Sequence, residues 1–253
     1  MNSFTEAEKK MFSEMSVCIL SPIQWIEPEW VRATVNMVAY SWHNGLKVEE
    51  MGITIRQVID WARNDLVRAG MEKKRMLTGD TLDYTHFLWL DTDHIFNGDL
   101  CCQLARHFAI PEVDSVSALY FARTGTYMPV AYVKDFNTDP YKHFPLVEVP
   151  NNLCEVDATG FGAILMKRDV FERVPYPWFT LDWRAGEDIA FCVEAKKRGI
   201  RFFLDGQYKL GHLGDRQVIT EKTYRQYQAE HPEKFADKIK VGLGGKRDGT
   251  NLQ

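Results

Sequence analysis

Two aspartates, Asp91 and Asp93, directly follow a run of apolar and aromatic residues in the stretch THFLWLDTDHIFNGDL, at positions 85–100. Two carboxylates two residues apart can converge on one divalent cation, and their hard oxygens suit Mg²⁺ or Mn²⁺. Two other uses are chemically open: Asp93 or Asp99 could cap the helix expected next, and Asp91 could attack a phosphate. The tripeptide by itself does not choose among these uses.

Two later motifs also carry side chains that can do chemistry. Glu187 and Asp188 follow Gly186 in GEDIAFC and open an expected amphipathic helix. Acids in a first helical turn are favoured by the helix dipole, so they either serve only the helix or include a general base. His212 stands between glycines in GHLG, after an expected strand, and is either a structural histidine or a ligand.

A glycine-rich motif lies between these two regions. In DATGFGAILMKRDVF, Gly160 and Gly162 bracket Phe161. Glycines in a strand pattern indicate either that the backbone approaches a ligand closely or that a β-bulge carries a packed aromatic side chain. Both interpretations remain open from the sequence.

The elements that must position these residues alternate between strand and helix in the first half of the chain. Thr54 and Gly70 are expected to begin and end the second helix, and Pro22 to stop the first strand. The alternation predicts a parallel sheet with crossover helices, in which ligands bind beyond the carboxyl ends of strands. Asp91 and Asp93 are therefore expected to lie in a site. The expected strands are 16–21, 46–53 and 85–90, and the expected helices are 28–45, 54–70 and 98–108.

The second half is less regular and predicts a mixed or antiparallel edge to the sheet. We expect one domain over residues 1–239 and a flexible tail over 240–253, because the tail has four glycines and little hydrophobicity. The expected strands are 115–122, 129–133, 146–150, 153–159 and 201–206, and the expected helices are 168–174 and 186–200.

Composition narrows the class of protein. The 253 residues, 45% hydrophobic and 26% charged, are typical of a soluble globular protein, and a net charge of −4 predicts no large nucleic-acid surface. Five cysteines without a CxxC motif favour buried, reduced thiols over a disulfide framework or zinc site. The polar start is not a signal peptide, and no run reaches the roughly 18–20 apolar residues of a membrane helix. We therefore expect a cytoplasmic protein.

Taken in order, the motifs resemble those of the GT-A glycosyltransferases. A short strand ending in Ser-Pro, a helix containing ARN, the apolar strand with Asp-x-Asp, DATGFGAILMKRDVF, GEDIAFC and GHLG follow one another from about Val17 to about Gly214. The resemblance is closest to the small inverting-type enzymes related to the bacterial family-two group. It implies an α/β fold of the GT-A (Rossmann-like) type, with a mixed, mainly parallel sheet flanked by helices. It also implies metal-dependent transfer of a sugar from a nucleotide diphosphate, most simply UDP, to an acceptor hydroxyl.

The resemblance also implies a role for each acidic site residue. Asp93 would bind Mn²⁺ or Mg²⁺ directly, and His212 would complete the metal shell. Asp91 would contact the nucleotide ribose or reach the metal through water. Asp188, paired with Glu187, would take the proton of the acceptor hydroxyl, which predicts inversion if it is the base.

The remaining family positions would surround the donor. Independently of the resemblance, Arg63, or Arg216 in the loop after His212, either helps to clamp phosphates or lies on a solvated face. The expected nucleotide pocket consists of Pro22, Arg63, Asn64, Asp91 and Thr92. The expected border of the donor sugar and acceptor consists of Gly160, Phe161 and Gly162.

Other classes of protein stay open. LDTDHI resembles the loop of haloacid-dehalogenase phosphatases, with Asp91 as nucleophile, but Ile95 stands where Thr or Val is usual and 89 residues precede LDTDHI. A nucleotidyltransferase would have a glycine-rich phosphate loop after the first strand, where SPIQWIEPEW has none. A non-catalytic nucleotide- or carbohydrate-binding module would retain the fold without the reaction. The acceptor and the oligomeric state are not predicted.

Overall fold

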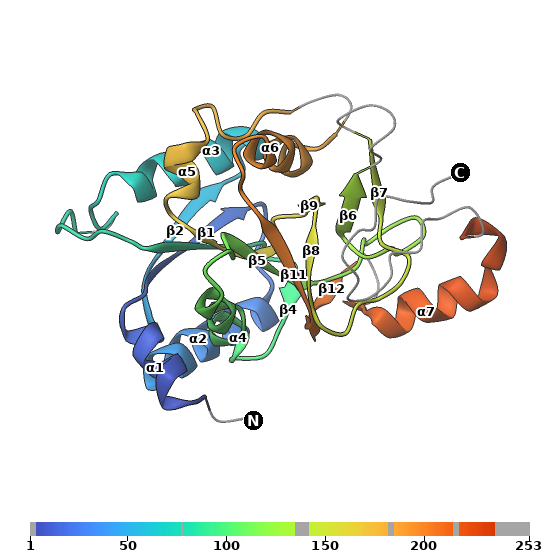
Figure 1. Cartoon of the computed structure of the whole chain (residues 1–253), viewed down its shortest axis with the longest axis horizontal. Coiled ribbons are helices and arrows are strands. Elements are labelled where there is room, and N and C mark those ends of the chain that lie inside the picture. Colours follow the sequence, from blue (N-terminus) through green and yellow to red (C-terminus); the bar gives the residue numbers. More distant parts are fainter. Residues whose placement is uncertain (1–3, 77, 135–141, 182–184, 215–217, 236–253) are drawn as a thin grey trace.

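A computed structural model describes residues 4–76, 78–134, 142–181, 185–214 and 218–235. The fold is mixed α/β, with a central seven-stranded sheet in the order β2-β1-β3-β10-β5-β11-β8 and helices on both faces (Figure 1). Its strands are β1 (Ser16–Ile23), β2 (Lys47–Ile55), β3 (His86–Leu90), β5 (Ser115–Leu119), β8 (Leu153–Val156), β10 (Ala163–Lys167) and β11 (Phe202–Lys209).

The sheet is mainly parallel, as expected. β1 pairs in parallel with β2 and β3, and β5 pairs in parallel with β11. β10 is antiparallel to both β3 and β5, so β5 and β11 run in the same direction as β3. β8 is antiparallel to β11 and forms the edge. The carboxyl ends of β1, β3, β5 and β11 therefore meet on one side of the sheet, where a site is expected.

Helices cover each face of the sheet over an apolar core. One face carries α3 (Ile59–Met71), α5 (Val170–Arg173) and α6 (Glu187–Lys196), and the other carries α1 (Glu6–Ser13), α2 (Pro28–His43) and α4 (Leu100–Ala105) (Figure 1). All of β3 is buried, with Phe87 and Trp89 in one core and Leu88 and Leu90 in the other. The apolar run before Asp91 is thus a central strand that serves both cores.

Two small sheets and a late helix complete the described part of the chain. β4 (His94–Ile95) pairs with β12 (Gly211–Leu213), which pairs with β13 (Val218–Ile219). A second sheet joins β6 (Ala131–Lys134), β7 (His143–Pro145) and β9 (Ala158–Thr159). The remaining helical segments are α7 (Glu221–Glu230) and 3₁₀ turns at Arg106–Ala109 and Pro232–Lys234.

Three local predictions about element ends are wrong. Thr54 lies within β2, and α3 begins at Ile59 with Val58 in the N-cap position. β1 continues through Pro22, which costs no bond on the β3 side because the pairing with β3 already ends at Leu20. Asp99 occupies the N-cap position of α4 but makes no capping hydrogen bond. Its carboxylate instead accepts hydrogen bonds from the Tyr208 hydroxyl at 2.7 Å and from Gln103 Nε2 at 3.1 Å.

The strand expected at 146–150 is also absent from its place. The structure has a short strand at His143–Pro145, and the chain then continues as a loop whose Leu146, Val147 and Val149 are buried in the core. The apolar pattern there reflects burial of a loop rather than strand pairing.

Four further predictions concern the C-terminal tail and Arg216, the single domain, the cysteines and membrane-spanning helices. The predicted tail, 240–253, and Arg216 lie outside the described residues, and the single domain over 1–239 stays a prediction. All five cysteines are described and unpaired, and four of them are buried. Within the described ranges, no helix is both long and apolar enough to cross a membrane.

Candidate active site

Asp91 and Asp93 lie where the chain leaves the carboxyl end of β3. The N–H of Asp91 donates to the Gly162 carbonyl at 2.9 Å, which continues the pairing of β3 with β10 by one step. This bond places the glycine-rich motif, 160–162, directly beside the two acids. The sheet topology therefore unites two motifs that are about seventy residues apart in the chain.

Asp93 belongs to a group of three side chains whose types and spacing could hold a metal ion. Its Oδ2 lies 3.4 Å from Nε2 of His212. His94 joins them, and one ligand atom from each of the three lies within 4.8 Å of the others. Nδ1 of His212 lies 2.7 Å from the Phe121 carbonyl, which only accepts, so Nδ1 carries a proton and Nε2 is the nitrogen that faces Asp93 and could bind a cation. Oδ1 of Asp93 is buried and has no hydrogen-bond partner among the described residues, so this donor set fits a divalent cation.

Asp93 is held in its ionised form. Burial acts to raise its pKa, but the hydrogen bond with His212 and the nearby charges of the histidines and Arg123 lower the pKa to about 2. Nη1 of Arg123 lies 2.8 Å from Oδ2 of Asp93. An ionised carboxylate is the form that binds a metal, so Asp93 is ready to do so throughout the neutral pH range.

Arg63 organises the acids on the other side of Asp91. Its Nε donates to Oε1 of Glu187 at 3.0 Å, and its Nη2 lies 3.6 Å from Oδ1 of Asp91. The residue is only 3% exposed. Its guanidinium carbon lies 5.2 to 5.8 Å from the ring centroids of Trp89, Phe161 and Phe179. Aromatic faces and carboxylates together compensate for burial of this cation.

Two acids at the site have strongly raised pKa values. Burial, reinforced by Glu187, raises the pKa of Asp188 to about 6 against the opposing charge of Arg63. Burial likewise raises the pKa of Asp91 to about 6, although Arg63 lowers it and a third of the Asp91 side chain is exposed. Oδ1 of Asp188 accepts the N–H of Ile189 at 2.7 Å. Carboxyl groups perturbed in this way are typical of sites that move protons.

Gly160 and Gly162 are required by protein packing at the site. A Cβ on Gly160 would overlap the Tyr120 hydroxyl, and a Cβ on Gly162 would overlap Nε2 of His94. The Tyr120 hydroxyl accepts the N–H of Gly162 at 3.1 Å. Phe161 is 1% exposed, and its ring packs in the core against Trp89 and Phe179. The packed-aromatic interpretation thus applies to the Phe161 side chain.

We expect Gly162→Ala to destabilise the protein by about 1–3 kcal/mol, because the new methyl forces His94 and Tyr120 to move in a packed interior. Urea unfolding of the two proteins measures the difference. In the double variant Gly162→Ala/His94→Ala the ring is gone, so the added methyl should cost less than it does alone. Strictly additive costs would show that the methyl is accommodated without moving His94.

Two residues assigned by resemblance to the nucleotide pocket are otherwise engaged. The side-chain amide of Asn64 donates to the carbonyls of Asp60 and Phe179, and its oxygen accepts the N–H groups of Trp178 and Phe179. Three of these four hydrogen bonds hold the loop at 178–179 and the fourth stays within α3, so the protein itself occupies the polar atoms of Asn64, and its nucleotide contact stays a prediction. The Thr92 hydroxyl donates to the Trp25 carbonyl at 2.7 Å and fastens the loop after β1.

Pro22 is the remaining described residue of the predicted nucleotide pocket, and its contact with a nucleotide stays a prediction. Pro22 lies in β1, half-buried, one residue before the strand ends.

Three residues of the site were not predicted from the sequence: His94, Tyr120 and Arg123. His94 directly follows the Asp-x-Asp motif, a signal that could have been used. Tyr120 and Arg123 carry no motif and are brought to the site only by the position of β5.

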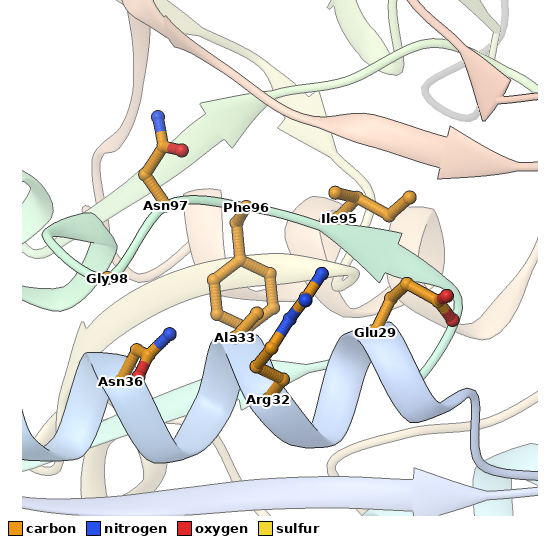
Figure 2. A pocket seen from close by; sticks show the side chains of 8 residues that line it. All are labelled: Glu29, Arg32, Ala33, Asn36, Ile95, Phe96, Asn97 and Gly98. Atoms are coloured by element: carbon orange, nitrogen blue, oxygen red, sulfur yellow. The ribbon is translucent and has the colours of Figure 1, made fainter.

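A separate cavity lies on the α2 face of the sheet. It has a volume of about 300 Å³ and lies between α2 and the segment after β4 (Figure 2). None of the residues predicted to bind donor, metal or acceptor lines it. Its lining residues are Glu29, Arg32, Ala33, Asn36, Ile95, Phe96, Asn97 and Gly98.

Comparison with known proteins establishes the fold and no more. No protein-family profile and no curated protein sequence matches the chain. The crystal structure of A197 from STIV matches 81% of this chain and 93% of its own at 18% identity, with a TM-score of 0.54, which shows a shared fold. A crystal structure of GalNAc-T7 with UDP, GalNAc and Mn²⁺ matches 85% of this chain and 47% of its own at 10% identity, with a TM-score of 0.45. The chain spans about half of that protein, and a similarity this low shows neither a shared activity nor a shared ligand.

Proposed function

We propose that this protein is a metal-dependent glycosyltransferase that moves a sugar from a nucleotide diphosphate to an acceptor hydroxyl. The observation that carries the proposal is the meeting of two different groups at Asp91. Asp93 and His212, a metal-binding pair, lie on one side, and the Arg63–Glu187–Asp188 cluster lies on the other, with Asp91 electrostatically coupled to both. Donor activation and proton removal need these two kinds of chemistry side by side.

Asp93 and His212 would hold Mn²⁺ or Mg²⁺. Such a cation, when bound, neutralises the charge that develops on a leaving diphosphate. Arg123, which lies against Asp93, is placed to contact the same phosphates. Asp91 stands between the metal-binding pair and Arg63, and its partly exposed carboxylate can accept hydrogen bonds from the ribose of the donor.

Asp188 would accept the proton of the attacking hydroxyl. A carboxylate with a pKa of about 6 holds a proton more strongly than an ordinary aspartate and still ionises at neutral pH, which is the compromise required of a general base. Attack assisted by this base, on the face opposite the leaving diphosphate, gives inversion. UDP is the donor nucleotide we expect, and the acceptor is to be found by screening.

The proposal is tested by incubating the protein with UDP-, GDP- and TDP-sugars, with and without Mn²⁺, and measuring bound nucleotide and released diphosphate. We expect metal-dependent binding and turnover, with metal-dependent nucleotide binding lost in Asp93→Ala because the ionised metal ligand is gone. Asp99→Asn is the matched control: it removes a carboxylate six residues away that bonds Tyr208 and Gln103, and should leave binding unchanged.

The two rival classes give different results in the same experiment. Hydrolysis of p-nitrophenyl phosphate that Asp91→Asn abolishes would identify a phosphatase of the haloacid-dehalogenase type instead. Nucleotide or sugar binding without any turnover, across donors and acceptors, would identify a non-catalytic module.

A further inference from the structure

His94 is a buried histidine that the proposed function leaves without a role. It lies in β4, directly opposite His212 of β12 in the strand register, and the two ring centroids are 4.5 Å apart. The residue is 1% exposed. Its ring also lies against that of Tyr120, with a centroid distance of 4.5 Å. The fold therefore places the His94 imidazole beside Asp93 and His212, on the side that faces the protein interior.

The hydrogen bonding of His94 is incomplete. The backbone of Gly211 approaches the ring, but within the described structure no hydrogen bond of ordinary geometry reaches its buried Nδ1. Burying a polar nitrogen without a partner is costly, and such groups in native proteins usually have a specific purpose. Gly162 is kept free of a side chain at the point where Nε2 of His94 lies. The His94 ring therefore has space around Nε2, and its Nδ1 has no hydrogen-bond partner among the described residues.

The distances among the three side chains suit a common cation. Ligands bound at about 2.1 Å in a tetrahedral arrangement are about 3.4 Å apart. Oδ2 of Asp93 and Nε2 of His212 have this separation, 3.4 Å. One ring nitrogen of His94 completes a set in which all the ligand atoms lie within 4.8 Å of one another. The Phe121 carbonyl accepts a hydrogen bond from Nδ1 of His212 and so orients the ring, as backbone carbonyls often do for histidines that bind metals.

We propose that His94 is a third protein ligand of the metal ion, beside Asp93 and His212, and that this two-imidazole set selects transition metals over Mg²⁺. This inference rests on the metal role of Asp93 and His212 in the proposed function. Imidazole nitrogen suits Fe²⁺, Ni²⁺, Cu²⁺ and Zn²⁺, and the affinity of such a site rises from Mn²⁺ through Co²⁺, whereas Mg²⁺ prefers oxygen ligands and keeps its waters. Asp91 is outside the three-residue group, which leaves its carboxylate to Arg63 and the donor.

The test measures metal binding directly on the full chain. Metal-free protein is titrated with Co²⁺ and followed by visible absorption, and Mn²⁺-loaded protein is studied by pulsed electron paramagnetic resonance, which counts coupled imidazole nitrogens. We expect two coupled imidazoles in the wild type and one in His94→Gln, with Co²⁺ affinity reduced by at least the roughly 10- to 100-fold that loss of an outer-shell partner costs. Mg²⁺ should displace Co²⁺ far less effectively than Mn²⁺ does.

His86→Gln is the matched control. His86 is a buried histidine at the opposite end of β3, hydrogen-bonded to Thr85, and its replacement should leave metal binding unchanged. Thermal unfolding of each variant confirms that it is folded before metal is added. If His94→Gln does not fold, the imidazole count in the wild-type protein decides the question alone.

The possible results separate the inference from the proposed function. A single coupled imidazole in the wild type, or Co²⁺ affinity within about twofold of wild type in folded His94→Gln, would show His94 to be a core histidine only. Absence of Mn²⁺ and Co²⁺ binding to the wild type would overturn the inference and the metal role of Asp93 together. Two coupled imidazoles without turnover of any donor would support the inference and contradict the glycosyltransferase.

Discussion

We expect Asp188→Asn to lower the proposed sugar transfer severely and to leave binding of the donor nucleotide unchanged. The amide has nearly the shape of the carboxylate and can still accept the N–H of Ile189, but it cannot take up the proton of the acceptor hydroxyl. Loss of a positioned general base lowers turnover by about 10²- to 10⁴-fold. Steady-state kinetics give the change in kcat, and calorimetry with the donor nucleotide gives the binding constant.

The pH dependence of transfer distinguishes a base from a residue that only binds the acceptor. Since burial and Glu187 raise the pKa of Asp188 to about 6, wild-type kcat/KM should rise as the pH increases through about 6, where the base loses its proton. Residual kcat in Asp188→Asn should lack this rise when it is measured at saturating donor, so that ionisation of Asp91 does not alter donor binding. Glu194→Gln, on the same helix but paired with Lys197 and Arg198, is the control and should keep wild-type kinetics. Near-normal transfer by Asp188→Asn would rule out the base.

Arg63→Met lowers the free energy of unfolding by about 3–5 kcal/mol at neutral pH, because it leaves buried carboxylates without their cation. Glu187 loses a 3.0 Å ion pair, and Asp91 loses its nearest positive charge. The penalty should shrink as the pH falls, since the stranded carboxylates can then take up protons in the folded protein. Urea unfolding at neutral and mildly acidic pH measures both effects.

Arg68→Met provides the comparison on the same helix. Arg68 is half-exposed and pairs with Asp65 and the Tyr176 hydroxyl, so its loss should change the free energy of unfolding by no more than about 0.5 kcal/mol. If Arg63→Met cost as little as Arg68→Met, the acids around Asp91 would not depend on Arg63 for their charge balance. Its role would then be limited to packing against the three aromatic rings.

The alternating first half of the chain and its central strand could be predicted from the sequence because their signals are local. The buried run at 86–90, the helical spacing in 28–43 and 59–71, and the acids directly after β3 each depend on residues close together in the chain. The rule that ligands bind at the carboxyl ends of parallel strands then placed Asp91 and Asp93 at a site. Element ends were less predictable, as Thr54 and Asp99 show, because tertiary contacts override local capping preferences.

Only the tertiary structure decided which side chains share the site. His94 meets His212 across 118 residues because β4 and β12 pair, and Arg63 meets Glu187 across 124 because α3 and α6 cover the same face. The same packing committed Asn64 to backbone hydrogen bonds and the Phe161 ring to the core, whereas the resemblance had implied positions beside the donor for both residues. The sequence by itself determined the parallel strands of the first half, the acids and their end of the strand, but not β10, which lies antiparallel at the centre of the sheet and was not among the expected strands. The partners of those acids depend on the distances between elements that are far apart in the chain, and these distances exist only once both cores are packed.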